Sequence, residues 1–261
     1  MCKTEPKEND RLANIPLSVV IPVYDEVARI PGTLRQIVEF LDARGQPYEV
    51  LVVDDGSTDA TAECVEEFSR HHAQVRLVRC PANRGKGAAV RTGMLQAQGQ
   101  FRLFTDADLS APIAELDRLL EPLQNGYDVA FGSRALKREW ISVHQSGLRE
   151  RAGQLFNLAL RMITGMPFQD TQCGFKAFRN QAAQHLFSQQ TINRFGFDGE
   201  VLYLARKFRY RTLEVPVHWA HSEGSKVHML RDGLRMACDL LRVRWNDWTG
   251  KYSRAASQPP Q

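Results

Sequence analysis

The sequence is poor in cysteine and has no long apolar run. Its five cysteines are odd in number and far apart, and no CxxC pair occurs, so we expect neither a disulfide framework nor a structural zinc site. This usage fits a reducing cytosol. No apolar run reaches the length of about 18 residues that a membrane span needs, and residues 1–14 are polar and charged. We therefore expect no signal peptide and no membrane-spanning helix, and any membrane contact should be peripheral.

The chain also has little net charge. Lysine and arginine number 34 against 30 acidic residues, a net charge of +4, which is too small to indicate nucleic-acid binding. The excess lies at the C-terminal end, where residues 226–254 carry seven basic and three acidic side chains. A nucleic-acid-binding module using this segment is an alternative, but its two tryptophans lie on an apolar stripe rather than on a stacking platform.

That stripe lies in residues 229–248 and has helical spacing. It consists of Leu230, Leu234, Ala237, Leu241, Trp245 and Trp248, with arginines beside it. A basic amphipathic helix of this kind is typical of a membrane surface, with tryptophans at headgroup depth. The alternative is that the stripe packs on the rest of the protein and the arginines are solvated.

The first half alternates short valine-rich runs with segments of helical periodicity, which predicts βαβ units around a mainly parallel sheet. We expect strands at 17–23, 50–54, 75–78, 101–105 and 128–131, and helices at 30–43, 59–71, 86–98 and 113–124. Later in the chain we expect a helix from about 148 to 164, a strand at 171–178, and helices near 181–188 and 198–207. The predicted organisation is a polar tail (1–15), one catalytic domain (16–228), the basic helix (229–254) and a disordered tail (255–261).

Polar or glycine-bearing residues follow four of the predicted strands: 24–26, 54–57, 106–108 and 132–134. In an open parallel sheet the carboxyl ends of the strands form the ligand crevice, so these clusters should converge. The strongest chemical signal among them is Asp106-Ala107-Asp108. Two carboxylates at a strand end suit an oxygen-preferring divalent ion that bridges a diphosphate, although acidic residues also occur in such loops simply because loops are polar.

A second acidic cluster, Asp54-Asp55, precedes a turn and a helix. We assign Asp59 to capping that helix, whereas the adjacent charges of Asp54 and Asp55 need a ligand or ion to compensate them. A carboxylate here could accept hydrogen bonds from uracil or ribose. Residues 83–91 then place glycines and basic residues at a helix start, which favours anions but lacks the P-loop spacing; a glycine-rich turn with solvated basic residues is the alternative.

Taken together, these motifs resemble glycosyltransferase family 2, with the GT-A fold: a Rossmann-like nucleotide-binding half on a mainly parallel sheet, and a second half that binds the acceptor. The motifs in the first half are Ile21 to Glu26, Asp54 to Thr61, Asn83 to Gly93, Asp106 to Asp108 and Gly132 to Arg134. The motifs in the second half are similar to the dolichyl-phosphate β-glucosyltransferases. They are Asp170 to Lys176, Phe197 to Tyr203, Glu214 to Trp219 and Glu223 to Lys226.

The resemblance implies a role for individual residues. Nucleotide-sugar binding falls to Pro22, Tyr24, Glu26, Val53, Asp55, Asp106, Ala107, Asp108 and Lys226. Asp106 and Asp108 would also hold the metal, Mg2+ or Mn2+. Arg134, Arg149 and Arg151 would clamp the acceptor phosphate, since guanidinium groups match phosphate oxygens well. Asp170 is expected to orient the acceptor first and to act as a base second, because a lipid phosphate is already an anion at neutral pH.

The resemblance therefore implies inverting transfer of a hexose, glucose, from a UDP-sugar to a polyprenyl phosphate at the cytoplasmic face of a membrane, with no nucleic-acid partner. Leu109 stands where glycine is expected in the glucosyl group, so a GDP-mannose donor is an alternative, as is a saccharide acceptor. A nucleotidyltransferase is disfavoured, because the glycine-rich basic signature of that class is missing after the first predicted strand. Intact Asp106, Asp108 and Arg134 argue against a non-catalytic scaffold.

Overall fold

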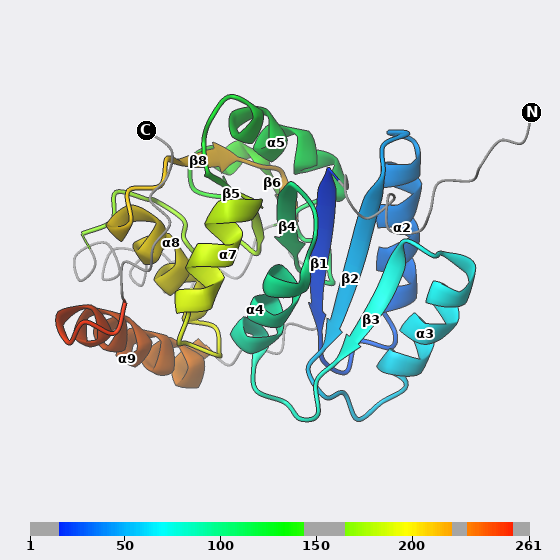
Figure 1. Cartoon of the computed structure of the whole chain (residues 1–261), viewed down its shortest axis with the longest axis horizontal. Coiled ribbons are helices and arrows are strands. Elements are labelled where there is room, and N and C mark those ends of the chain that lie inside the picture. The colour runs from blue at the N-terminus through cyan, green and yellow to red at the C-terminus, as the bar shows by residue number, and fades with distance from the viewer. Residues whose placement is uncertain (1–15, 144–164, 221–228, 253–261) are drawn as a thin grey trace, which may run out of the picture.

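The computed structural model describes residues 16–143, 165–220 and 229–252, and within this part the chain forms a three-layer α/β fold (Figure 1). The central sheet has seven strands in the order β3-β2-β1-β4-β7-β5-β8. Its strands are β1 (Leu17–Val23), β2 (Tyr48–Asp54), β3 (Val75–Arg79), β4 (Phe101–Thr105), β5 (Val129–Ser133), β7 (Phe175–Arg179) and β8 (Thr212–Pro216). A separate parallel pair is formed by β6 (Ile141–Val143) and β9 (Trp219–Ala220).

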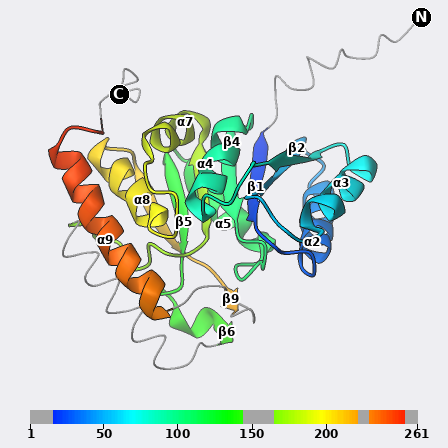
Figure 2. The ribbon, with the colours of Figure 1, turned by 90° about the horizontal axis from the view of Figure 1, so that it is seen from below.

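Helices cover both faces of the sheet, as Figures 1 and 2 show. One face packs against α4 (Lys86–Gln96), α7 (Asn180–Gln189) and α8 (Phe197–Lys207). The other packs against α2 (Ile30–Asp42), α3 (Thr61–His71) and α5 (Leu116–Gln124), the last preceded by a short 3-10 turn, η1 (Ile113–Glu115). Val20 and Val53 belong to the first core and Val19 and Val52 to the second, because successive strand residues point to opposite faces.

The expected strands at 17–23 and 101–105 are confirmed at both ends. The strand expected at 171–178 begins only at Phe175, because a turn occupies the preceding residues. This strand, β7, lies between β4 and β5 and is antiparallel to both, whereas the other pairs in the sheet are parallel. Strands β6, β8 and β9 were not expected from the sequence, and the helix expected from about 148 to 164 lies outside the described residues.

The C-terminal helix α9 (Met229–Trp248) packs beside α8 (Figure 2), but the face it buries is not the predicted stripe. Leu240, Val243 and Asn246 are buried. Leu241, Trp245 and Trp248 are instead 60%, 59% and 81% exposed, so the alternative in which the stripe packs on the rest of the protein is wrong for these three residues. The side chains of Leu230, Leu234 and Ala237 lie outside the description. No helix in the described part of the chain combines the length and the apolarity that crossing a membrane requires.

A buried carboxylate, Glu200 in α8, fixes the end of α9. Its oxygens accept hydrogen bonds from the Thr191 amide and hydroxyl at 3.0 and 2.6 Å, from the Ile192 amide at 2.8 Å and from the Tyr252 hydroxyl at 2.7 Å. Asn246 of α9 reaches the same Thr191 hydroxyl at 3.1 Å. One fully buried side chain therefore connects α8, the loop before it and the segment after α9.

Replacing Glu200 with alanine should lower the free energy of unfolding by about 3 kcal/mol or more, because several buried donors lose their acceptor together. Tyr252→Phe removes only one of these donors and should cost about 1 kcal/mol. Urea denaturation of the three proteins measures both values. Equal stability of wild type and Glu200→Ala would contradict this account of the helix docking.

Candidate active site

The polar clusters that follow the strands meet at the carboxyl edge of the sheet. At the ends of β1 and β2, Asp25 accepts the Thr58 amide at 2.7 Å, and the Asp25 amide donates to the Ser57 hydroxyl at 2.9 Å. Asp54 accepts the amide and the hydroxyl of Ser57 at 3.0 and 2.5 Å. Asp54 is therefore compensated by its own turn.

The residues expected at the nucleoside lie along these two strand ends. Pro22, Tyr24 and Glu26 are partly buried, and Glu26 forms an ion pair with Arg29 at 2.8 Å. The charge of the neighbouring Asp25 raises the pKa of Tyr24. The Val53 side chain is fully buried in the core, so only its backbone can face a ligand. The helix expected from residue 59 begins at Thr61, and the Asp59 carboxylate accepts its amide at 2.9 Å.

Asp55 holds the glycine-rich loop in front of α4. Its carboxylate accepts the amides of Arg84 and Gly85 at 3.0 and 2.7 Å. Burial raises the pKa of Asp55, and these two hydrogen bonds lower it in part. Gly85 has a φ of +108°, and a side chain there would also meet the Asn193 carbonyl oxygen at 2.6 Å. The loop conformation therefore depends on glycine, and it places Lys86 as the first residue of α4.

Lys86 reaches across to the Asp106 carboxylate, with 2.5 Å between Nζ and Oδ1. Burial alone would lower the pKa of Lys86, but the charges of Asp106 and Asp198 raise it above its ordinary value, so the side chain stays charged. The other Asp106 oxygen lies against Gly174, where a Cβ atom would stand 2.1 Å from Oδ2. The orientation of Asp106 therefore requires a glycine at 174.

Ala107 and Asp108, the rest of the acidic motif, are held by hydrogen bonds that involve backbone groups. The Ala107 carbonyl oxygen accepts the Thr33 hydroxyl of α2 at 2.5 Å, and Asp108 accepts the Ser110 amide at 3.0 Å. Leu109 has a φ of +46°, which a leucine adopts only with strain. Asp106 and Asp108 are both partly exposed, as ligands for a soluble ion must be.

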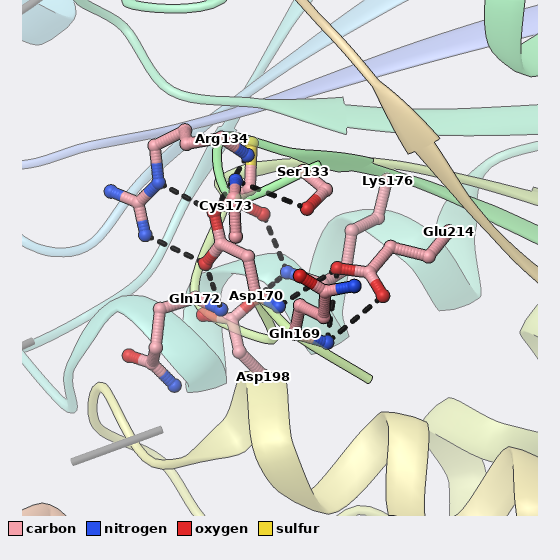
Figure 3. A network of polar contacts seen from close by, with 10 residues as sticks. Ser133, Arg134, Gln169, Asp170, Gln172, Cys173, Lys176, Asp198 and Glu214 are labelled. Carbon is pink, nitrogen blue, oxygen red and sulfur yellow. Dashed lines mark hydrogen bonds and ion pairs between the residues drawn. The ribbon is translucent and has the colours of Figure 1, made fainter. Parts of the chain in front are cut away.

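Arg134 and Asp170, expected at the acceptor, bind each other. Nε and Nη2 of Arg134 donate to the two Asp170 oxygens at 2.6 and 2.7 Å, and the Arg134 amide donates to Oδ2 at 3.0 Å (Figure 3). Glu214 of β8 in turn accepts the amides of Gln169 and Asp170 at 2.9 and 2.8 Å. Burial alone would raise the pKa of Asp170, but Arg134 brings it below its ordinary value of 3.8. Positioning therefore suits Asp170 better than base catalysis.

A buried ion pair lies beneath this network. Lys176 Nζ is 2.5 Å from Asp198 Oδ1 and donates to the Cys173 carbonyl oxygen at 2.5 Å, and the Lys176 side chain is 0% exposed. Lys86, Lys176, Asp198 and Glu214 were not assigned to the site from the sequence. All four lie inside the quoted motifs, but a motif does not show which of its charges pair. Arg149, Arg151 and Lys226 lie outside the described residues, so their roles stay predictions.

The oxygen ligands in the site fit a divalent cation whose coordination shell is completed by a substrate. Among the described residues, no group of three or more histidine, cysteine, aspartate and glutamate side chains could hold a metal by itself. Asp106 and Asp108 offer two hard oxygen ligands at one partly exposed strand end. Mg2+ commonly binds one or two carboxylates together with substrate phosphates.

Comparison with known proteins agrees with the fold and the motifs. Residues 18–187 match glycosyl transferase family 2, and the chain belongs to that family; it is a glycosyltransferase. It is 35% identical over 250 residues to the dolichyl-phosphate beta-glucosyltransferase of Homo sapiens, covering 90% of this chain and 77% of that protein. The protein of the same description from Saccharomyces cerevisiae is 34% identical over 254 residues, covering 90% and 76%.

Solved structures confirm the GT-A fold. Glucosyl-3-phosphoglycerate synthase from Mycobacterium tuberculosis, in complex with Mn2+, UDP and glucosyl-3-phosphoglycerate, superposes with a TM-score of 0.62 at 19% identity, covering 94% of this chain and 86% of that one. Mannosyl-3-phosphoglycerate synthase from Rubrobacter xylanophilus gives a TM-score of 0.64 at 19% identity, covering 95% and 78%.

Gly174→Ala should lower the glycosyltransferase activity by about a hundredfold or more, because the new methyl group displaces a carboxylate in the site. Gly32→Ala is the matched control, since a Cβ atom there meets nothing within 4 Å. It should leave activity unchanged and stabilise α2 by about 0.5–1 kcal/mol. Steady-state rates and thermal unfolding of both variants provide the measurement, and a fully active Gly174→Ala protein would contradict the described position of Asp106.

Proposed function

We propose that this enzyme transfers glucose, with inversion, from UDP-glucose to the phosphate of a polyprenol such as dolichol. The observation that carries the proposal is the similarity of about 35% over most of the chain to proteins described as dolichyl-phosphate beta-glucosyltransferases. The arrangement of Asp55, Lys86, Asp106 and Arg134 at one edge of the sheet supports it, because it provides adjacent places for a nucleoside, a diphosphate and a second anion.

On the donor side, Asp55 and the strand ends around Tyr24 would receive the nucleoside. Asp106 and Asp108 would hold Mg2+ or Mn2+, which when bound neutralises the leaving diphosphate. Lys86 lies within reach of the same phosphates. The solved structure of the same fold that contains Mn2+ and UDP supports a divalent ion in the site.

On the acceptor side, the Arg134–Asp170 pair is neutral overall and holds one guanidinium group in a fixed position. Asp170 accepts hydrogen bonds from Nε and Nη2 of Arg134 and so fixes the plane of the guanidinium. A phosphate monoester carries close to two negative charges at neutral pH and is itself the nucleophile, so no strong base is needed. Arg149 and Arg151 are proposed to complete the phosphate clamp, and Lys226 to contact the donor phosphates.

The exposed face of α9 supports contact with a membrane surface at the cytoplasmic side. Leu241, Trp245 and Trp248 point outward, and the two tryptophan rings contact each other with centroids 5.2 Å apart. Exposed arginines, Arg242 and Arg244 among them, flank this face. Apolar aromatic side chains with neighbouring cations fit an anionic lipid surface, which is where a polyprenyl phosphate resides.

Asp106→Asn and Asp108→Asn should each lower the rate of sugar transfer by about a hundredfold or more while leaving the fold intact. Each substitution removes a carboxylate charge that would bind the cation, and the cation would neutralise the leaving diphosphate. Asp117→Asn is the control, since that carboxylate is 62% exposed and pairs with Arg44 away from the site. The purified proteins are incubated with Mg2+ or Mn2+, a panel of UDP- and GDP-sugars and a short polyprenyl phosphate, and the lipid product is identified by mass. Full activity in excess EDTA would refute the metal requirement, and a mannosyl product from GDP-mannose would replace the proposed donor.

The double substitution Trp245→Ala/Trp248→Ala should weaken binding to vesicles containing anionic lipid by about a hundredfold or more, since each tryptophan side chain that the lipid buries contributes about 2 kcal/mol to binding. Both side chains are exposed, so the fold should be unaffected. Val27→Ala, which truncates an exposed apolar side chain before α2, is the control and should bind like wild type. Vesicle sedimentation measures the partitioning, and equal binding of all three proteins would exclude α9 as the contact face.

A further inference from the structure

The Lys86–Asp106 ion pair lies where the proposed metal ligand should be available. Resting on the proposed function, we propose that Lys86 is a built-in counter-ion that keeps divalent cations off Asp106 until a diphosphate is present. The pair is part of the site rather than of the core: the Lys86 side chain is 20% exposed and that of Asp106 is 34% exposed. Both side chains can therefore exchange partners without unfolding their surroundings.

The backbone on both sides of the pair is fixed. Asp55 holds the amides of Arg84 and Gly85, so the start of α4 cannot withdraw Lys86 without breaking these bonds. On the other side, Gly174 packs against Asp106 Oδ2, which leaves Oδ1 as the oxygen that Lys86 contacts. Only the flexible lysine side chain is free to move, and its four-carbon stem allows that.

A divalent cation and an ammonium group cannot share this carboxylate cheaply. Two like charges within about 4 Å repel by several kcal/mol at the dielectric of a protein surface, and the cation carries two charges. The cation must therefore displace Lys86. The free energy of the lost Lys86–Asp106 ion pair then weakens the binding of the cation. Metal alone should bind weakly for this reason.

A diphosphate removes that penalty because it gives the ammonium another anion. The start of α4 is also held by the loop that precedes α8, where the Ala88 amide donates to the Asn193 carbonyl oxygen at 3.0 Å, so the exchange requires only the Lys86 side chain to move. With the donor bound, Lys86 can pair with a phosphate oxygen while Asp106 becomes available. Cation and nucleotide should consequently bind synergistically.

The test measures Mn2+ binding by titration calorimetry, first to the protein alone and then to the protein saturated with UDP. Lys86→Met should bind Mn2+ alone about tenfold tighter or more than wild type, the value of one charge-assisted contact, and the gain from UDP should shrink. Arg84→Met is the matched control because it removes a positive charge two residues away on the same loop, from an exposed side chain. It should change the affinity for Mn2+ alone by less than about threefold, the effect of a screened surface charge.

The outcomes separate this proposal from the proposed function. The role of Lys86 would be overturned if wild type and Lys86→Met bound Mn2+ alone with equal affinity, or if Lys86→Met and Arg84→Met raised that affinity equally. Neither result would contradict the metal site. A wild-type protein that binds no Mn2+ even with UDP would overturn the metal site itself, and the lysine proposal with it. Thermal unfolding of Lys86→Met without ligands checks that the variant is folded; Lys86→Gln, which also removes the charge, takes its place if it is not.

Discussion

Between β4 and β5 the sheet contains one strand, β7, that runs against its neighbours, and the geometry of the site depends on that reversal. A parallel strand would bring its carboxyl end to the ligand edge, whereas β7 brings its amino end, with Phe175 opposite Thr105. The turn before β7 is thereby placed between the ends of β4 and β5. Gly174 meets Asp106 on one side, and Asp170 meets Arg134 on the other.

Three of the carboxylates crowded at this edge are balanced by the protein's own cations. Asp106 pairs with Lys86, Asp170 with Arg134 and Asp198 with Lys176. The Lys176–Asp198 pair is nearly inaccessible, and burying two charges costs several kcal/mol for each ion before their attraction repays it. The buried Lys176–Asp198 pair is therefore weak evidence for a contribution to folding stability. It indicates instead that the site requires this arrangement of charges. The partly exposed Lys86–Asp106 pair is better suited to exchange than the buried one.

The sequence was sufficient for the regular parts of the fold and for the identity of the site motifs. Periodicity located β1, β4 and most helices, because burial on one or both faces leaves a strong pattern. It could not show that β7 is antiparallel, since strand direction depends on contacts distant in sequence. It also placed Leu241, Trp245 and Trp248 on a stripe without showing that Leu240 and Val243, one helical step away, form the buried face. The sequence could not show which charges pair, for the same reason. It assigned Arg134 and Asp170 separate roles, whereas in the structure the two side chains bind each other.

Helix α8 is a spacer of fixed length between two parts of the molecule. Its first turn carries both Asp198, which lies at the site, and Glu200, and the side chains of Glu200, Tyr203 and Lys207 bind Tyr252 and Asp247 in and after α9. A helix rises about 1.5 Å per residue and resists compression. The position of α9 relative to the site therefore depends on the spacing along α8 between Asp198 and the residues that bind α9. A one-residue insertion in this helix would rotate α9 by about 100° as well as shift it, so the distance of α9 from the site and the orientation of its outer face cannot be altered independently.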